Sequence, residues 1–400
     1  MRPFSLAASV ALLAGCAPLE RPAGFSPPPD VAYAWVRFTP TKVPASGAAG
    51  LADRAAGRTI TIDDPIRVAS VSKIVTALTV MRLVDEGRLS LDEDVSARLG
   101  YALRNPHFPD KPITLRMLLS QTSSVRDQGE NYVIRFGEAI RPRIEAADSF
   151  DPDHPPGTFF RYANLNSGIV ATLLEKVTGE RFDRLSHRLV LQPLGLAACF
   201  NWTMCSDAAV ARAVTLYDED GSVVLDDLKG RRPACPVFTA PGVECDLDAY
   251  ELGTNGALFS PQGGLRISAE GLTVIGQMLM NGGTHRGSVF LKPGTVRQMT
   301  SPQWRFDGRN GATESGFYCR YGLGIQLLPG SDPACRDRLL ADGRAMFGHA
   351  GEAYRVRSGL WIDSIRREGI AYVAANNGKD PPRGRTEYRA IEEWLAARLR

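Results

Sequence analysis

The order of hydrophobic patterns along the chain is the feature that most restricts its fold. Residues 31–38 and 58–64 alternate apolar and polar side chains or carry β-branched ones, which predicts two early strands. Helical periodicity then dominates from residue 70 to about residue 200. Further strands are expected at residues 321–328, 357–364 and 368–377, before a closing helix at residues 385–400. Because hairpins join the late strands, we expect an α/β fold of the α+β type, with a largely antiparallel sheet flanked by helices.

A mostly helical insertion, at about residues 90–260, interrupts this plan. Its clearest helices are expected at residues 114–123 and 166–179, and the second should end at Gly179. Residues 201–258 are rich in Asp, Gly, Pro and Cys without a clean period, so loops with short elements are expected there. The insertion should leave a cleft between itself and the sheet.

The composition is that of an ordinary globular protein. Of its 400 residues, 44% are hydrophobic and 23% are charged, enough for one large domain or two moderate ones. The formal net charge of +3 is too small to indicate a nucleic-acid partner, and no basic run is interleaved with aromatic residues. Binding partners must therefore be inferred from candidate sites.

The first residues look like an export signal. Arg2 precedes an apolar run from Phe4 to Leu13 that is too short to span a bilayer, and Ala14, Gly15 and Cys16 follow. This layout resembles a bacterial lipoprotein signal, which implies removal of residues 1–15 and lipidation of Cys16. The alternative is a soluble secreted protein in which Cys16 is incidental.

The segment after the signal indicates where the protein would be held. Ala17 follows the cysteine, and by resemblance to lipoprotein sorting this favours an outer-membrane anchor facing the periplasm. Residues 16–30 are rich in proline and are expected to form a stiff tether. The folded domain should then span residues 31–400.

Six further cysteines suggest disulfides, because their number is even and the chain looks exported. Many pairings are allowed. We expect three local ones, namely Cys199 with Cys205, Cys235 with Cys245, and Cys319 with Cys335. A zinc site is less expected, since the chain has no C-x-x-C pair and its five histidines are scattered.

Ser70 and Lys73 form a Ser-x-x-Lys motif at the start of an apolar helix predicted to begin near Ser70. On a helix this spacing places both side chains on one face, about one turn apart. Burial lowers the pKa of a lysine, so Lys73 could take a proton from Ser70. Backbone N–H groups near a helix N-terminus could stabilise a developing oxyanion. The structural alternative is a helix-capping serine followed by a surface lysine.

Two other segments carry polar residues where a cleft is expected. Tyr162 and Asn164 stand between a Pro-Gly turn and a helix, so a loop could project them toward Lys73 and a substrate carbonyl. His349 and Gly351 precede a predicted strand, and a small residue at a strand edge lets a substrate lie against the sheet. Taken singly, Tyr162 could instead be a packed aromatic and His349 a structural turn residue.

In order, these motifs resemble one superfamily, that of class C β-lactamases, D-alanyl-D-alanine carboxypeptidases and serine esterases. The matching segments are Ser70–Lys73, residues 118–124, Tyr162–Asn164, Pro193–Gly195, residues 263–272 and His349–Gly351. The resemblance covers about residues 31–400. It implies an antiparallel sheet with flanking helices and a mostly helical inserted domain.

The resemblance also implies roles for individual residues. Ser70 would be the acylated nucleophile and Lys73 its proton acceptor or electrostatic support. Tyr162 would act as general base and acid, and Asn164, His349 and Gly351 would bind substrate. The backbone N–H groups of Ser70 and Glu352 would form the oxyanion hole.

Departures from the family pattern narrow the expected activity. His349 replaces the lysine of typical class C β-lactamases, and Ala350 lacks a hydroxyl that often helps to bind the substrate carboxylate. Carboxypeptidases, aminopeptidases and esterases of the family carry histidine there. Gln121 also departs from the usual residue, with an expected structural effect. If the following strand is regular, Arg355 and Arg357 share one face and could bind an anionic substrate end.

We therefore expect a serine hydrolase that acts on a small-molecule or peptide substrate and needs no metal or organic cofactor. The substrate would be a D-amino-acid peptide, a small ester or a slowly hydrolysed β-lactam. The alternative is a low-turnover β-lactam-binding protein or sensor with the same fold. An α/β-hydrolase with His349 as base is disfavoured, because the chain contains no G-x-S-x-G elbow.

Overall fold

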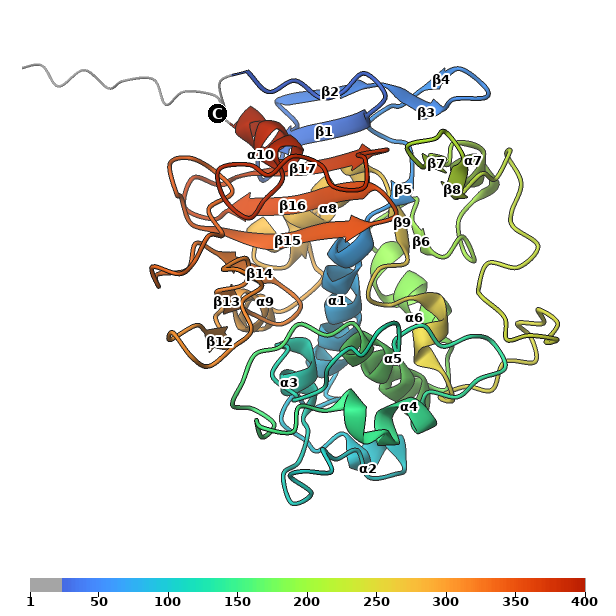
Figure 1. Cartoon of the computed structure of the whole chain (residues 1–400), viewed down its shortest axis with the longest axis vertical. Coiled ribbons are helices and arrows are strands. Elements are labelled where there is room, and N and C mark those ends of the chain that lie inside the picture. The colour runs from blue at the N-terminus through green and yellow to red at the C-terminus, as the bar shows by residue number, and fades with distance from the viewer. Residues whose placement is uncertain (1–23, 400) are drawn as a thin grey trace, which may run out of the picture.

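The computed structural model describes residues 24–399, and an antiparallel sheet of eight strands is its largest feature (Figure 1). The strand order is β12-β13-β14-β15-β16-β17-β1-β2. The bounds are β12 Trp304–Arg305, β13 Arg320–Tyr321, β14 Gln326–Leu328, β15 Met346–Ala353, β16 Val356–Asp363, β17 Glu368–Ala375, β1 Ala32–Phe38 and β2 Ala45–Ala49. Adjacent strands pair antiparallel throughout. The predicted antiparallel α+β fold is thus confirmed.

Helices cover both faces of this sheet. The helices are α1 Ser72–Asp85, α2 Ser96–Leu99, α3 Leu115–Leu119, α4 Arg141–Glu145, α5 Leu165–Thr178, α6 Phe182–Ser186, α7 Asp207–Ala211, α8 Ala269–Met280, α9 Pro293–Thr300 and α10 Ala390–Ala396. Helix α8 packs on β1, β16 and β17, while α10 packs on β16 and β17 from the other side. Because strand side chains alternate, Leu360 joins the main core and Trp361 the cluster under α10.

Smaller sheets complete the described chain. Their strands are β3 Leu51–Asp53 with β4 Arg58–Thr59, β7 Leu216–Tyr217 with β8 Val223–Leu225, β10 Thr284–His285 with β11 Ser288–Val289, and β5 Ile66–Arg67, β9 Leu265–Ile267 and β6 Cys199–Phe200. The strand predicted at residues 58–64 is therefore only β4, since the Asp64 carboxylate accepts the Thr61 N–H and folds the chain into a turn.

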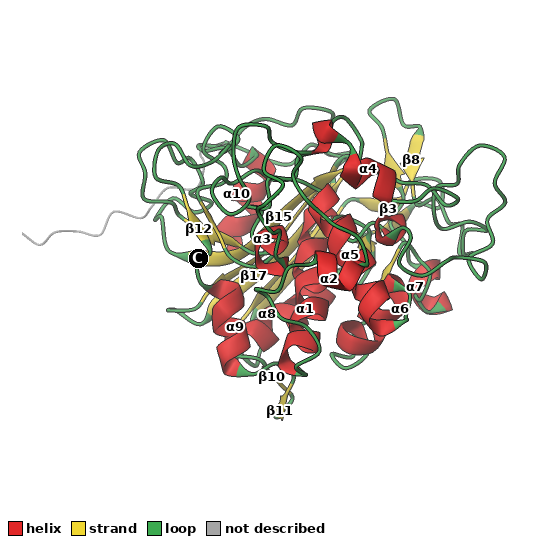
Figure 2. Cartoon of the chain, turned by 90° about the horizontal axis from the view of Figure 1, so that it is seen from below, coloured by secondary structure: helices red, strands yellow, loops and turns green. Residues whose placement is uncertain are grey.

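Residues 90–260, all within the described part, are less helical than expected. Helix α5 is the one α-helix there with more than five residues, and Gly179 caps it with a left-handed backbone as predicted. Helix α6 continues without a break into a π-helical segment at His187–Leu191. The remaining helices are single turns joined by loops, in keeping with the many prolines between residues 106 and 156. Seen from below (Figure 2), α1, α2 and α5 gather into one block in front of the sheet.

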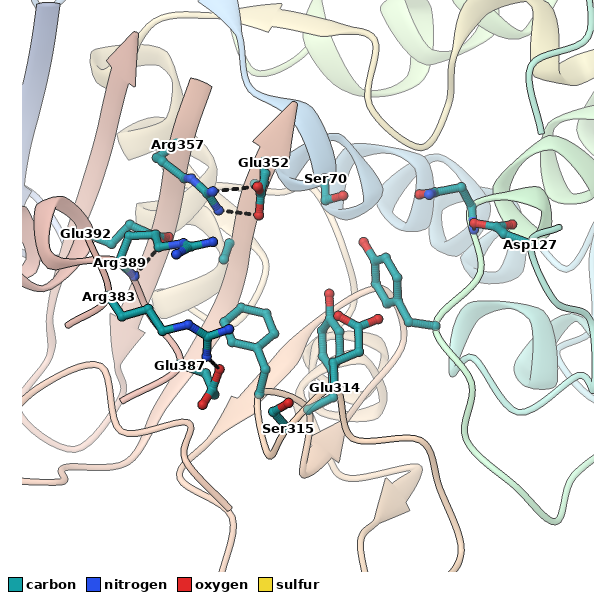
Figure 3. A pocket seen from close by; sticks show the side chains of 16 residues that line it. Ser70, Asp127, Glu314, Ser315, Glu352, Arg357, Arg383, Glu387, Arg389 and Glu392 are labelled. Carbon is teal, nitrogen blue, oxygen red and sulfur yellow. Dashed lines mark hydrogen bonds and ion pairs between the residues drawn. The ribbon is translucent and has the colours of Figure 1, made fainter. Parts of the chain in front are cut away.

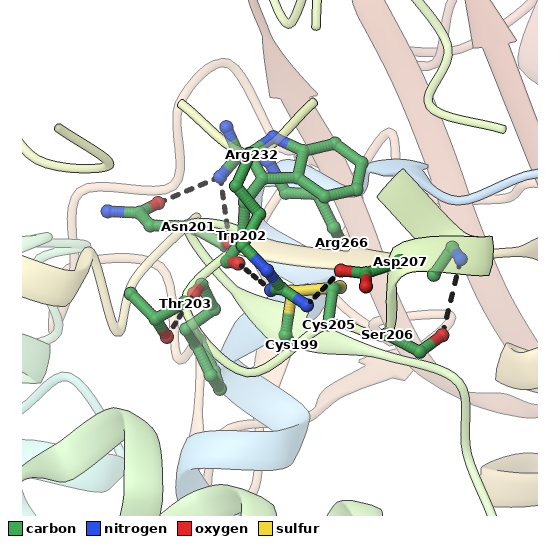
Figure 4. The surroundings of a disulfide bond; sticks show 12 residues. Cys199, Asn201, Trp202, Thr203, Cys205, Ser206, Asp207, Arg232 and Arg266 are labelled. Carbon is green, nitrogen blue, oxygen red and sulfur yellow. Dashed lines mark hydrogen bonds and ion pairs between the residues drawn. A yellow bond between two sulfur atoms is a disulfide. The ribbon is translucent and has the colours of Figure 1, made fainter. Parts of the chain in front are cut away.

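The loops of residues 201–258 contain or border two disulfides and one buried ion pair. Cys199 is bonded to Cys205, Cys235 to Cys245 and, farther along, Cys319 to Cys335, which confirms the three expected pairs. Figure 4 shows the first of these beside Trp202 and Arg266. Asp226 lies 2.9 Å from Nη2 of Arg266 and also accepts the Trp202 indole N–H at 2.7 Å. Both charged side chains are at most 4% exposed, so the loops are anchored to β9 below the water-exposed surface.

The predictions for the N-terminal segment are only partly covered. The signal of residues 1–15, Cys16 and the first half of the tether lie outside the described residues. Phe25, within the tether, is half-buried and packs against the cluster under α10, so this end of the tether lies on the domain. No helix within residues 24–399 is long and apolar enough to cross a bilayer.

Candidate active site

Ser70 sits on a tight turn immediately before helix α1. The α-helix begins at Ser72, two residues later than expected, because Ala69–Val71 form a 3₁₀ turn in which Ala69 has a φ of 45°. The turn still places Ser70 one turn before Lys73, and Nζ of Lys73 lies 3.1 Å from Oγ of Ser70. Ser72 points elsewhere, and its Oγ accepts the N–H of Leu265. The expected pairing of Ser70 with Lys73 is therefore present.

Lys73 is a buried amine with three polar neighbours. Besides Ser70, its Nζ donates to Oδ1 of Asn164 at 2.8 Å and to the carbonyl oxygen of Gln262 at 3.1 Å. Burial lowers the pKa of Lys73 to about 7, although the carboxylates of Asp127 and Glu314 oppose the shift. Amide and carbonyl oxygens only accept hydrogen bonds. A neutral Lys73 therefore donates both protons to them and turns its lone pair toward the Ser70 hydroxyl.

Tyr162 lies between this amine and a stack of aromatic rings. Nζ of Lys73 is 4.7 Å from the centre of the Tyr162 ring, and Tyr318 stacks on that ring at 4.7 Å. Phe160, Trp304 and Tyr321 continue the aromatic cluster. The Tyr162 hydroxyl is buried without a well-aligned hydrogen-bond partner among the described residues, and burial raises its pKa above the ordinary value. The phenol therefore stays protonated at neutral pH.

Asn164 is held at the N-terminus of α5 by residues that the sequence motifs did not reveal. The carboxylate of Asp127 accepts the N–H of Asn164 at 2.8 Å and that of Leu165 at 3.0 Å. Gln121 accepts the N–H of Ala163 at 3.0 Å, in agreement with the structural effect expected of it. Asp127 lies three residues after the 118–124 segment, and this position was the one feature of the sequence that could have indicated a role in the site.

Gly351 lets strand β15 approach the nucleophile turn. A Cβ atom on Gly351 would lie 2.3 Å from the Val68 carbonyl oxygen and 3.3 Å from the Ser70 nitrogen, so any side chain would push the strand away. Glu352 follows on the same strand and borders the same cavity as Ser70. The two backbones assigned to an oxyanion hole thus meet at one place.

His349 lies behind the site rather than on its surface. Its imidazole is fully buried, and Nε2 is 2.8 Å from the Tyr321 hydroxyl. Nδ1 lies 2.5 Å from the Ala350 carbonyl and donates to it, so Nε2 accepts from Tyr321. Burial lowers the pKa of His349 to about 3 and keeps the ring neutral. Its side chain borders neither cavity described below, in contrast to the expected substrate contact, and instead orients Tyr321.

The two arginines predicted to share a strand face do not do so. Tyr354 and Arg355 form the turn between β15 and β16, both with left-handed backbones, so the strand begins only afterwards. Arg355 pairs with Asp218 at 2.6 Å, away from Ser70. Arg357 pairs with Glu352.

One large cavity opens beside Ser70, and we call it the charged cavity (Figure 3). Its volume is about 640 Å³. It is bordered by Ser70, Tyr162 and Asn164 and by the charged side chains of Asp127, Glu314, Glu352, Arg357, Arg383, Glu387, Arg389 and Glu392. Each of its arginines has a carboxylate partner: Arg357 with Glu352, Arg383 with Glu387, and Arg389 with Asp380.

Glu314 differs from the other acids of the charged cavity. Its side chain has no hydrogen-bond or ion-pair partner within residues 24–399, and Figure 3 shows it facing the space in front of Ser70. Surrounding protein and the nearby Glu352 raise its pKa to about 7. Nothing in the sequence motifs identified this residue, since its loop makes no recognisable pattern.

A second cavity lies on the other side of Ser70, and we call it the aromatic cavity. Its volume is about 320 Å³. Its border includes three aromatic side chains, several aliphatic ones and three charged ones. These are Tyr132, Phe238 and Tyr354, then Ala69, Val133, Ile134, Ala257, Leu258 and Ala353, and finally Arg67, Glu130 and Glu352. Ser70, Asn164 and Glu352 border both cavities, whereas Tyr162 borders only the charged one. Ser70 is thus reached from two sides, and the two sides have different linings.

Within residues 24–399, no three His, Cys, Asp or Glu side chains are grouped so as to hold a metal ion. Within the described residues, each charged side chain that borders the charged cavity makes a hydrogen bond or an ion pair, apart from Glu314.

The site can be compared with known proteins. Penicillin-binding protein 4 of Amycolatopsis lactamdurans is 31% identical over 150 residues, which are 37% of this chain and 39% of that protein. The chain thus matches well under half of this curated relative.

Solved structures match over a longer stretch. The class C β-lactamase of Rhodobacter sphaeroides has a TM-score of 0.65 at 18% identity, over 92% of this chain and 95% of its own. EstCE1, described as a hydrolase with promiscuous acyltransferase activity, has a TM-score of 0.65 at 20% identity, over 92% and 93%. These identities show a shared fold. The sequence profile of the Beta-lactamase family matches residues 31–393, and the chain therefore belongs to the β-lactamase family.

Proposed function

We propose that the chain is a serine hydrolase that forms an acyl-enzyme on Ser70 and releases it with water. The observation that carries this proposal is the environment of Lys73. Two of its neighbours can only accept hydrogen bonds, and its pKa is lowered to about 7, so its lone pair faces the Ser70 hydroxyl near neutral pH. Without an adjacent base, the hydroxyl of a serine is a weak nucleophile.

The remaining groups supply the other needs of acyl transfer. As Oγ of Ser70 attacks a carbonyl carbon, Lys73 takes its proton, and the backbone N–H groups of Ser70 and Glu352 receive the developing oxyanion. The protonated Tyr162 then donates its proton to the leaving atom as the bond to the acyl carbon breaks, and the ammonium of Lys73 returns a proton to Tyr162. In the second step a water attacks the acyl carbon and gives its proton to Lys73, and Oγ of Ser70 leaves and recovers a proton from Lys73. Proton donation by Tyr162 refines its expected base and acid role, because its raised pKa suits an acid rather than a base. The amide nitrogen of Asn164 is free to bind substrate, since Oδ1 is used by Lys73.

The substrate class follows from the site in part. An open site with an oxyanion hole suits esters, D-amino-acid peptides and β-lactams alike. His349 cannot replace the family lysine as a cation, because it is neutral and faces Tyr321. We therefore place esters and peptides ahead of β-lactams.

Intact mass spectrometry tests the proposal. Wild-type protein and the Ser70→Ala and Ser72→Ala variants are incubated with a fluorophosphonate and, separately, with a penicillin or an ester. We expect one adduct on wild type and on Ser72→Ala, and none on Ser70→Ala. An ester adduct that decays with time indicates a hydrolase, whereas a persistent penicillin adduct indicates the low-turnover binding protein. An unlabelled wild-type protein would contradict the proposal.

We further propose that the protein is a lipoprotein anchored through Cys16, with residues 31–393 facing the periplasm. The proposal rests on the sequence at residues 13–16 and on the disulfides, which form in oxidising compartments. Expression of the full chain in a Gram-negative host, with and without Cys16→Ser, tests it. The wild type should be found in the membrane fraction with a diacylglycerol mass increment, and the variant should be released from it. Equal fractionation of the two would contradict the anchor.

A further inference from the structure

Each of the two cavities faces a different part of a substrate bound at Ser70. Tyr162 borders the charged cavity and not the aromatic one, and in the proposed function it donates the proton to the leaving group. The leaving group must then lie in the charged cavity. The acyl group stays bonded to Ser70 and extends the other way, into the aromatic cavity. This step rests on the proposed function.

Two aromatic side chains on the border of the aromatic cavity are exposed. Phe238 is 56% exposed and Tyr354 is 40% exposed, and both border this cavity. Exposed aromatic side chains gathered around a concavity indicate a binding surface for an apolar group. Tyr354 is also fixed in place, because the guanidinium of Arg67 lies 4.9 Å from its ring centre while donating to the Gly263 carbonyl at 2.8 Å.

Phe238 is carried by a loop that is closed by a disulfide. Cys235 and Cys245 are bonded at the two ends of this loop. Its backbone is tied to the neighbouring loop, since the Phe136 N–H donates to the Phe238 carbonyl at 2.8 Å and the Ala240 N–H donates to the Phe136 carbonyl at 2.9 Å. The disulfide and these two hydrogen bonds therefore hold the loop in the position in which Phe238 is exposed.

The neighbouring loop is itself anchored to the helical core. The side-chain amide of Asn255 donates to the carbonyls of Ile134 and Arg135, each at 3.1 Å. Val243 packs directly over Gly137, where an added Cβ would lie 3.0 Å from its side chain. Part of the wall of the aromatic cavity is thus formed by two loops that are joined by hydrogen bonds and packing.

We propose that the disulfide-closed loop, residues 235–245, is a specificity element that selects substrates with an apolar, preferably aromatic, acyl group. Phe238 supplies the contact together with Tyr354, which borders the same cavity. The selected substrate joins this acyl group through an ester or amide to a polar leaving group that fits among the paired charges of the other cavity.

Ester hydrolysis with a fixed leaving group tests the loop. Nitrophenyl acetate and nitrophenyl phenylacetate differ only in the acyl group, and kcat/KM is measured for both. We expect wild type to favour phenylacetate by at least about 10-fold after correction for intrinsic reactivity. Phe238→Ala should lose about 10-fold on phenylacetate and clearly less on acetate, and Phe238→Leu should recover most of the loss.

Two further variants separate a binding role from a structural one. Cys235→Ser combined with Cys245→Ser frees the loop and should reduce the preference for phenylacetate in the same direction as Phe238→Ala. Ile365→Ala, at an 82% exposed apolar side chain in the turn between β16 and β17, should change neither rate.

The outcomes distinguish this inference from the proposed function. Acetate hydrolysis that depends on Ser70, without a preference for phenylacetate, would overturn the inference and leave the hydrolase standing. An equal loss on both esters in Phe238→Ala would overturn it as well. An absence of hydrolysis and of Ser70 labelling in wild type would overturn both.

Discussion

The side chains proposed to carry out catalysis and the walls around them are held by different kinds of structure. Ser70, Lys73 and Asn164 lie at the beginnings of α1 and α5, beside strand β15, where helices and sheet pack into the main core. The aromatic cavity is bordered mainly by loops, which are fixed by a disulfide, by backbone hydrogen bonds and, farther away, by the buried pair of Asp226 and Arg266. Changes in the first region should alter chemistry, and changes in the second should alter specificity or stability.

The largest expected effect is on the amine. Lys73→Met removes the proton acceptor and should slow fluorophosphonate labelling of Ser70 by about 10³- to 10⁴-fold. Lys176→Met, at an exposed position on α5, is the matched control and should label normally. Labelling of Lys73→Met at a rate near that of wild type would place the base elsewhere.

In the loop region, the buried ion pair of Asp226 and Arg266 should contribute more to the free energy of unfolding than an exposed ion pair does. Asp226→Ala leaves Arg266 buried without a partner and should lower the free energy of unfolding by about 3–5 kcal/mol. Asp207→Ala removes a carboxylate that is 95% exposed although it pairs with Arg232 at 2.9 Å, and should cost less than about 1 kcal/mol. Figure 4 shows Asp207 and Arg232 beside the Cys199–Cys205 disulfide, with Arg266, the partner of Asp226, nearby. Urea unfolding measures the difference, and equal losses in the two variants would contradict the assignment.

A smaller effect separates the two roles of the active-site tyrosine. Tyr162→Phe should reduce kcat/KM for an alkyl ester by about 10²-fold, since an alkoxide needs a proton to leave. A nitrophenyl ester, whose leaving group departs as an anion, should lose much less. An equal loss on both esters would indicate that Tyr162 acts as the base.

The sequence predicted contacts between residues that are close along the chain, and it did not predict contacts between residues that are far apart along the chain. Ser70 and Lys73 were predictable because three residues of spacing determine their contact. The three disulfides were predictable because each joins cysteines 6 to 16 residues apart. Asp127 accepts the N–H of Asn164 across 37 residues, and Glu314, which acts on the charge of Lys73, is far from it along the chain. Such partners follow from tertiary packing, which no local pattern encodes.

The errors have the same origin. His349 matched the position of a substrate-binding residue, yet burial and a hydrogen bond to Tyr321 turn it away from both cavities. Arg355 was expected on a strand, but its left-handed backbone lies in the hairpin turn between β15 and β16. The single-turn helices of residues 90–260 likewise reflect loops stabilised by distant contacts rather than by helical propensity.

The smallest predicted change is a shift in pH dependence. The Glu314 carboxylate raises the pKa of Lys73, opposing the effect of burial. Glu314→Gln should therefore lower the apparent pKa of Ser70 labelling, so that reactivity persists to lower pH than in wild type. Glu138→Gln, at a half-buried acid outside both cavities, should leave the profile in place. A profile moved to higher pH in Glu314→Gln would contradict the proposed electrostatics.

The pH dependence of fluorophosphonate labelling in wild type tests the central claim, that a buried neutral lysine activates Ser70. Lys73 is reactive when deprotonated and its pKa is lowered to about 7, so the labelling rate should be low in acid, rise through one ionisation near pH 7 and then level off. A rate that keeps rising to about pH 10, where an ordinary lysine or tyrosine ionises, would contradict the account.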